Sequence, residues 1–135
     1  MSKERYDLFT RPSVAIIKIN IEGEMYPFLL DTGSTCSDIT PSMAQKFAKH
    51  ILALKFRDSK IDDRITDVAD GLAYIPITTD DMKVFFAFRI SELDRLFDDM
   101  NNRYGIRPIG IIGNDFLDVC DVKIDYGDKS VEVNY

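Results

Sequence analysis

The sequence has few of the residues that usually build metal sites. It contains one histidine, His50, and two cysteines, Cys36 and Cys120, among 135 residues. The cysteines do not form a C-x-x-C unit, and a zinc site needs more ligands than these three side chains supply. We therefore predict no metal and no cofactor, and we interpret both cysteines as buried thiols. Without a serine or cysteine motif, His50 is expected to be a helix residue and not a catalytic base.

Positive charge and long apolar stretches are also scarce. The chain has 17 Lys and Arg against 23 Asp and Glu, a net charge of -6. This balance argues against a nucleic-acid partner, because such proteins neutralise phosphates. No apolar stretch approaches the length of a membrane span, and the charged residues 1–7 lack the apolar part of a signal peptide. We therefore expect a cytoplasmic protein with no membrane partner.

Acidic residues gather in one region without forming a metal loop. Their spacing fails the EF-hand pattern, which needs a glycine after three spaced acids and a distant glutamate. We interpret the region as a solvated acidic loop. Its aspartates are Asp58, Asp62, Asp63, Asp67, Asp70, Asp80 and Asp81.

Most of the chain shows patterns typical of strands, with no internal repeat, low-complexity segment or linker. We therefore predict one mostly β domain over residues 1–135. A hairpin is expected from Ile65 to Ile77, because Ala69-Asp70-Gly71 is a turn signal between two apolar segments. Further strands are expected at residues 13–21, 25–30, 82–90 and 109–113, with a final hairpin at residues 119–134.

Two or three short helices are expected between these strands. Thr40-Pro41 is a helix start signal, a hydroxyl N-cap followed by proline, for a helix that ends near Lys49. Ser91-Glu92-Leu93-Asp94 resembles a capping box and precedes a second helix. Asn114 is expected to cap a third. The apolar face of the second helix repeats at i, i+3, i+4 and i+7 through Leu93, Leu96, Phe97 and Met100.

One predicted strand ends in a carboxylate. Phe28-Leu29-Leu30 leads directly into Asp31-Thr32-Gly33-Ser34. An aspartate is rarely buried without a partner or a task, and a glycine two positions later lets the backbone bend sharply. Two interpretations stay open at this point. Asp31 is a functional carboxylate, or it forms an Asx turn with its own backbone.

A second glycine-containing segment lies about 80 residues further on. Ile109-Gly110-Ile111-Ile112-Gly113 is an apolar strand with two glycines three positions apart, which allow two backbone segments to approach closely. It is followed by Asn114-Asp115-Phe116-Leu117. No lysine for a phosphate loop follows, and no long helix completes a dinucleotide-binding unit.

The chain resembles the retropepsin-like (retroviral-type) single-domain aspartic proteases, and more closely their bacterial and cellular branch. Two segments carry this resemblance, Leu29 to Ser34 and Ile111 to Leu117. The resemblance spans Val14 to Val133. It implies a closed, mostly β barrel with two or three short helices. It also implies a homodimer that hydrolyses a peptide or protein substrate.

The resemblance also assigns roles to individual residues. Asp31 would be the catalytic carboxylate, and Thr32 would bond to the partner subunit. Gly33 would offer a backbone amide, and Ser34 would hydrogen-bond the carboxylate. A substrate-covering flap would comprise Val68, Ala69, Asp70, Gly71 and Leu72. Structural residues near the site would be Ile111, Ile112, Gly113, Asn114 and Asp115.

The chain carries this motif once, whereas the reaction needs one ionised and one protonated carboxyl group. A symmetric dimer would supply the pair by placing Asp31 opposite its own copy. Two alternatives remain. The domain is a peptide- or partner-binding module without turnover, or it is active only when other subunits assemble it.

Overall fold

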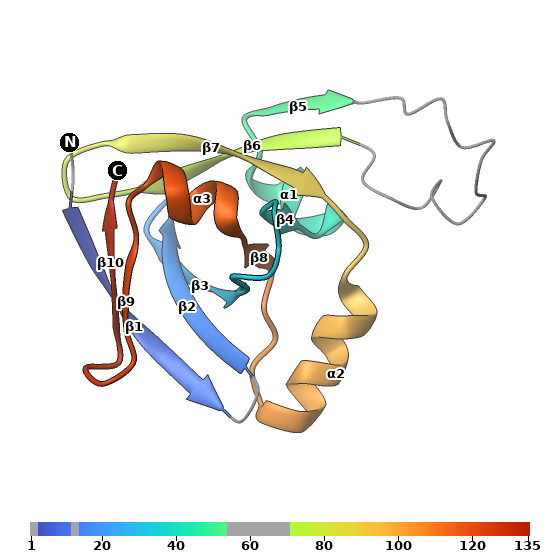
Figure 1. The fold of residues 1–135 in the computed structure, drawn as a ribbon. Coiled ribbons are helices and arrows are strands. Elements are labelled where there is room, and N and C mark those ends of the chain that lie inside the picture. Colours follow the sequence, from blue (N-terminus) through green and yellow to red (C-terminus); the bar gives the residue numbers. More distant parts are fainter. Residues whose placement is uncertain (1–2, 12–13, 54–70) are drawn as a thin grey trace.

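The structure is a computed structural model that describes residues 3–11, 14–53 and 71–135 (Figure 1). Within them lie three helices, α1 (Pro41–Phe47), α2 (Asp94–Tyr104) and α3 (Asn114–Val119). The strands are β1 (Lys3–Arg11), β2 (Val14–Ile21), β3 (Glu24–Leu30), β4 (Asp38–Ile39), β5 (His50–Ala53), β6 (Gly71–Thr78), β7 (Lys83–Ile90), β8 (Gly110–Ile112), β9 (Lys123–Asp125) and β10 (Ser130–Asn134). The fold is therefore mostly β, as predicted.

All ten described strands belong to one sheet, in the order β5-β6-β7-β4-β8-β3-β2-β1-β10-β9. The predicted closed barrel is wrong, because in the described part of the chain β5 and β9 end the sheet and do not pair with each other. β1 explains this arrangement. Its first half pairs with β10 and its second half with β2, so β9 and β10 extend the sheet beyond β1 and leave it open.

Two of the longer strands were not predicted, for different reasons. β1 (KERYDLFTR) buries Tyr6 and Leu8, and most of its other residues are charged or polar, so its apolar signal is weak. β5 begins at His50, which we expected to be a residue of the first helix. The backbone becomes extended at Ala48, after α1 has ended at Phe47. His50 is therefore an exposed strand residue and not a helix residue.

The helix starts differ from the predictions at two of three places. Thr40 is the N-cap of α1 and is followed by proline, as predicted, but its hydroxyl makes no capping hydrogen bond. The prediction of a capping box at the start of α2 is wrong. The N-cap is Leu93, and the Ser91 hydroxyl donates to Asp38 instead. Asn114 is the first residue of α3 and not its cap, which is Gly113. The final hairpin is also shorter than predicted, since α3 continues to Val119.

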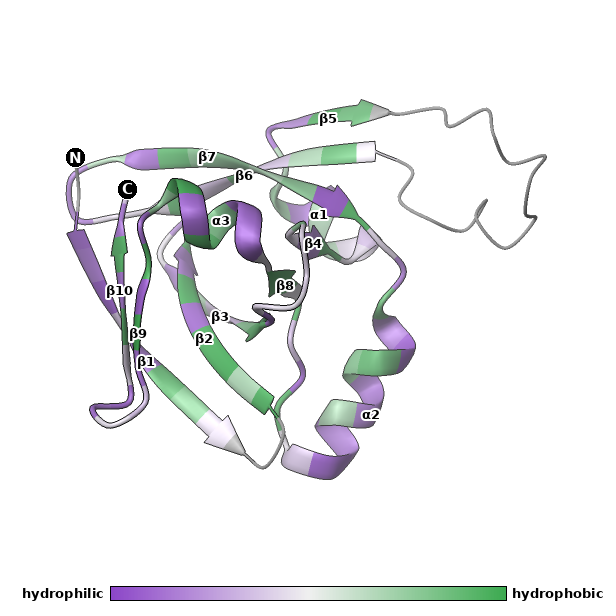
Figure 2. Cartoon of the chain, in the orientation of Figure 1, coloured by the Kyte–Doolittle hydropathy of each residue, from purple (hydrophilic) through white to green (hydrophobic). Residues whose placement is uncertain are grey.

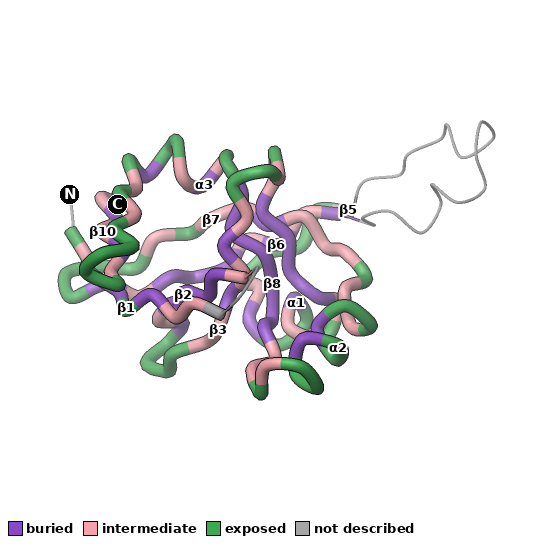
Figure 3. Tube along the Cα trace, turned by 60° about the horizontal axis from the view of Figure 1, so that its bottom comes forward, coloured by how far each residue is buried: buried purple, intermediate pink, exposed green. Residues whose placement is uncertain are grey.

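Two hydrophobic clusters fill the molecule, and most of β2, β6 and β8 is buried (Figure 3). The larger cluster lies among the strands, α1 and α3. The smaller one joins α2 to the sheet through the buried residues Ile16, Phe97, Met100 and Ile111. Hydrophobic and hydrophilic residues alternate around α2 (Figure 2). No helix among the described residues is long and apolar enough to cross a membrane.

Phe97 should anchor α2 to the sheet. Its side chain is fully buried in the smaller cluster, whereas the neighbouring Leu96 is 44% exposed. We expect Phe97→Ala to lower the free energy of unfolding by about 3 kcal/mol or more, because it leaves a cavity. Leu96→Ala on the same helix should change it by no more than about 0.5 kcal/mol. Urea denaturation measures both, and equal losses would contradict this assignment.

The hydroxyls of Tyr6 and Tyr135 lie 2.8 Å apart in a hydrogen bond. Burial raises the pKa of Tyr6 to about 12 and also raises the pKa of Tyr135. A raised pKa stabilises the fold below the unfolded value of about 10, and this contribution is lost as the pH rises toward 12. Between these pH values we expect Tyr6→Phe/Tyr135→Phe to lose less folding stability than the wild type, by about 2–3 kcal/mol or more, because Tyr6 alone accounts for that much.

Alkaline denaturation followed by circular dichroism measures this difference. Tyr126→Phe is the matched control, because Tyr126 is 57% exposed. An alkaline loss in the double variant equal to that of the wild type would show that the pair does not contribute.

Candidate active site

Asp31 stands where β3 ends beside β8. The two strands are parallel, and the Asp31 N–H donates to the Ile112 carbonyl at 3.0 Å, one residue beyond the paired strand. The carboxylate is half-buried, and its Oδ1 accepts the Gly33 N–H at 2.9 Å. The Asx turn considered from the sequence is therefore present. It occupies one side of one carboxylate oxygen and leaves Asp31 partly accessible.

The loop after Asp31 is held from the start of α3. The Asn114 N–H donates to the Ser34 carbonyl at 2.8 Å, and its side-chain amide donates to the Thr32 carbonyl at 2.6 Å. Thr32 and Gly33 are exposed. The Ser34 hydroxyl donates to the Cys36 carbonyl at 2.8 Å, so in this chain it does not hold the Asp31 carboxylate as the resemblance implied.

A buried polar network fixes the far side of the same loop. The Gly113 N–H donates to the Ser37 hydroxyl at 2.9 Å, and this hydroxyl donates to Asp115 Oδ1 at 2.7 Å. Asp115 Oδ2 accepts the Ser37 N–H at 3.1 Å. Asp115 also accepts the N–H of Phe116 in its own helix. It therefore joins α3 to the loop, which agrees with the structural role expected for it.

The two glycines of the second segment mark close backbone approaches, as the sequence predicted. A Cβ on Gly113 would overlap the Cys36 carbonyl oxygen and lie 2.9 Å from the Ser34 carbonyl oxygen. A Cβ on Gly110 would overlap the Asp38 carbonyl oxygen and approach the Phe28 ring. Any side chain at Gly113 would therefore push β8 away from the Asp31 loop.

An ion pair that the sequence reasoning missed lies directly after the loop. Asp38 is 3% exposed, and its Oδ1 accepts Arg89 Nε at 2.6 Å and the Ser91 hydroxyl at 2.7 Å. The hydrogen bond with Asp38 raises the pKa of Arg89. An arginine inside the apolar strand Phe88-Arg89-Ile90 was a signal for such a partner, because a charge in a sheet needs one.

The predicted flap is only partly described. Val68, Ala69 and Asp70 lie outside the described residues, as do the predicted hairpin's first strand and the aspartates from 58 to 70. Gly71 was expected at a turn, but it begins β6 and pairs with Ala53 of β5, because β5 supplies the strand opposite. Leu72 pairs with Leu52 in the same way.

The two cysteines differ in their surroundings. Cys120 is buried, as predicted, and burial raises its pKa to about 11. Cys36 is only half-buried on the Asp31 loop. Both are free thiols, and no disulfide joins them.

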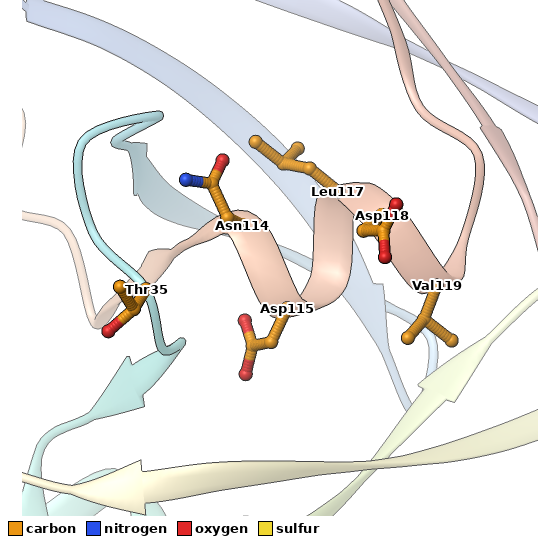
Figure 4. Close-up of a pocket in the computed structure, with 6 residues that line it drawn as sticks. All are labelled: Thr35, Asn114, Asp115, Leu117, Asp118 and Val119. Atoms are coloured by element: carbon orange, nitrogen blue, oxygen red, sulfur yellow. The ribbon is translucent and has the colours of Figure 1, made fainter.

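A surface pocket of about 660 Å³ adjoins this loop (Figure 4). Asp31 does not line it, so it is not where that carboxylate would meet a substrate. Thr35 contributes from the loop and the other five residues come from α3 (Figure 4). The lining residues are Thr35, Asn114, Asp115, Leu117, Asp118 and Val119.

No protein-family model and no curated protein matches the chain. Solved structures are similar to it, and two of them are retropepsin-like domains. A retropepsin-like aspartic protease from Rickettsia conorii has 15% identity and a TM-score of 0.52, covering 100% of this chain and 95% of its own. The retroviral protease-like domain of Ddi1 from Leishmania major has 16% identity and a TM-score of 0.51. This match covers 94% of this chain and 95% of that domain's chain. At such identities the likeness concerns the fold alone, and it confirms the predicted retropepsin-like fold but not the closed barrel. The chain therefore has a retropepsin-like fold.

Proposed function

We propose that the protein is an aspartic peptidase whose active site forms from two copies of Asp31, one from each subunit of a homodimer. The observation that carries this proposal is the half-exposed Asp31 carboxylate on a loop braced by α3, within a retropepsin-like fold. The solved structure that is named as a retropepsin-like aspartic protease supports hydrolysis of peptide bonds at the level of the fold. A second carboxylate would come from the partner.

The chemistry requires two carboxyl groups in different protonation states. The ionised Asp31 takes a proton from water, while the protonated copy polarises the scissile carbonyl. Two carboxylates at close range do not both ionise easily, which is a known property of aspartic proteases in general. The observed pKa values would belong to the pair and not to either residue. No metal and no covalent intermediate take part in this mechanism.

The substrate would lie extended and pair with the protein as an added strand. Thr32 and Gly33 are exposed, which suits a contact with the partner subunit. These assignments follow from the proposed function.

A digest of a diverse peptide library by the purified protein tests the proposal. We expect cleavage that is strongest at mildly acidic pH and that is unchanged by a metal chelator. Mass spectrometry of the products measures both properties. Full inhibition by the chelator, or no cleavage at any pH under conditions where the protein is dimeric, would contradict the proposal.

A binding module without turnover is the second candidate. The observation that favours it is that the loop makes its hydrogen bonds within one chain. The Gly33 N–H donates to the Asp31 carboxylate, and the Ser34 hydroxyl donates to the Cys36 carbonyl. A module of this kind would bind a pepstatin-type peptide or a library peptide without cleaving it. Sedimentation would distinguish a monomeric binder from a dimer that brings two Asp31 residues together.

A further inference from the structure

One row of paired residues crosses the sheet beside Asp31. Residues that pair directly across strands project to the same face of a sheet. Starting from β3, the row contains Leu29, Ile111, Asp38, Arg89, Leu72 and Leu52. Asp31 lies two residues beyond Leu29, and its N–H continues the bonding to β8. By the two-residue alternation of a strand, Asp31 leaves the backbone toward the same face as this row.

The row has a covered half and an open half. Ile111 is only 8% exposed, because Phe97 and Met100 of α2 pack over it. On the other half, the Arg89 side chain is 39% exposed and Leu52 is 44% exposed. β7 ends beside β4 and then leads to α2, so Arg89 lies where the open half meets the covered one (Figure 1). The row therefore presents a partly exposed cation on the face of Asp31.

Among the described residues, the hydrogen bonds of the Arg89 guanidinium to Asp38 leave its other edge without a partner. Nε donates to Asp38 Oδ1 at 2.6 Å and Nη2 approaches Oδ2 at 3.4 Å, so Asp38 occupies the Nε side. The Asp38 side chain is 4% exposed and is also held by Ser91, which fixes the position of the arginine. A guanidinium has five N–H donors, and its Nη1–Nη2 edge binds a second carboxylate as a fork.

We propose that Arg89 is a specificity-determining residue that binds an acidic side chain of the peptide substrate. This inference rests on the proposed function. Three strand spacings of about 4.8 Å separate Arg89 from β3, a distance of roughly 14 Å. An extended peptide covers this distance in about four residues. The aspartate or glutamate would therefore lie within about four residues of the scissile bond.

The test compares peptide pairs that differ only by Asp against Asn, or Glu against Gln, at positions within about four residues of the cleavage site. We expect the wild type to prefer the acidic peptide by about tenfold or more in kcat/KM, as a charge-assisted hydrogen bond warrants. Asp38→Asn/Arg89→Gln removes both charges together and avoids an unpaired buried carboxylate. This double variant should reduce the ratio of acidic to amide peptide to about one. Arg89→Lys should give an intermediate ratio, because lysine keeps the charge but lacks the two-donor edge of the guanidinium.

Arg107→Gln is the matched control. Arg107 is also partly exposed and binds two carboxylates, those of Asp94 and Asp98, but it lies outside the row. It should leave the ratio unchanged. The same peptides are also titrated onto the Asp31→Asn protein, so that the preference is measured as a ratio of Kd values without any cleavage.

The outcomes separate the two proposals. Cleavage by the wild type with equal rates for acidic and amide peptides would overturn the role of Arg89 and leave the peptidase standing. Acid-selective binding without cleavage would support Arg89 and contradict the peptidase. Binding or cleavage whose preference survives in Asp38→Asn/Arg89→Gln would overturn the role of Arg89. Failure of every peptide to bind or be cleaved would overturn both.

Discussion

An Asp31→Asn protein is expected to keep its fold and to cleave peptides at no more than about a thousandth of the wild-type rate. Asparagine retains a side-chain oxygen that accepts the Gly33 N–H, so the turn should persist. It cannot take a proton from water. Loss of general acid–base catalysis lowers the rate of a reaction by about 10²–10⁴-fold. In a symmetric dimer, one substitution removes both carboxylates.

The control for this variant is Asp7→Asn, which also replaces an exposed or half-exposed carboxylate by an amide. Asp7 lies in β1 and is exposed. Both variants should show wild-type circular dichroism, and only Asp31→Asn should lose activity. Retention of more than about a tenth of the rate by Asp31→Asn would mean that another group activates the water.

A Gly113→Ala protein should lose about 3 kcal/mol of stability and about a hundredfold in activity. Gly113 has a φ of -105°, which any residue adopts, so the effect is one of space alone. The added methyl would overlap the Cys36 carbonyl and crowd that of Ser34. Relief of this overlap moves β8 and α3 away from the Asp31 loop, and small displacements of a catalytic group are costly.

Gly127→Ala is the matched control for this substitution. A Cβ at Gly127 would meet only the Asp125 carboxylate, at an ordinary contact distance of 3.4 Å. We expect its stability to stay within about 0.5 kcal/mol of the wild type and its activity to be unchanged. Thermal unfolding and peptide cleavage measure both variants. Equal behaviour of the two alanine variants would show that the approach at Gly113 does not position the loop.

The sequence contained enough to predict the fold around Asp31. A run of apolar residues ending in Asp31, together with two glycines at Gly110 and Gly113, indicated a strand end and a close backbone crossing. The structure confirms both, because β3 and β8 lie side by side and no side chain fits at either glycine. Such local signals survive because each depends on a few neighbouring residues.

The closure of the sheet and the polar contacts behind the loop could not be predicted in the same way. Whether β1 pairs with β2 alone or also with β10 depends on residues more than 100 positions apart. Ser91 was expected to cap α2, but a buried Asp38 more than 50 positions away competes for its hydroxyl. Local pattern reasoning assigns such hydroxyls to the nearest backbone, whereas tertiary packing decides which acceptor they meet.

Purified heterodimers of wild-type and Asp31→Asn chains test most directly whether two copies of Asp31 form one active site. The two chains carry different affinity tags and are co-expressed, so that tandem purification isolates the mixed dimer, with a doubly tagged wild-type dimer as the reference. We predict that the mixed dimer cleaves peptides at no more than about a thousandth of the reference rate. About half of the reference rate would show that each chain acts with its own carboxylate, and failure to recover any dimer, mixed or wild-type, would contradict the paired site itself.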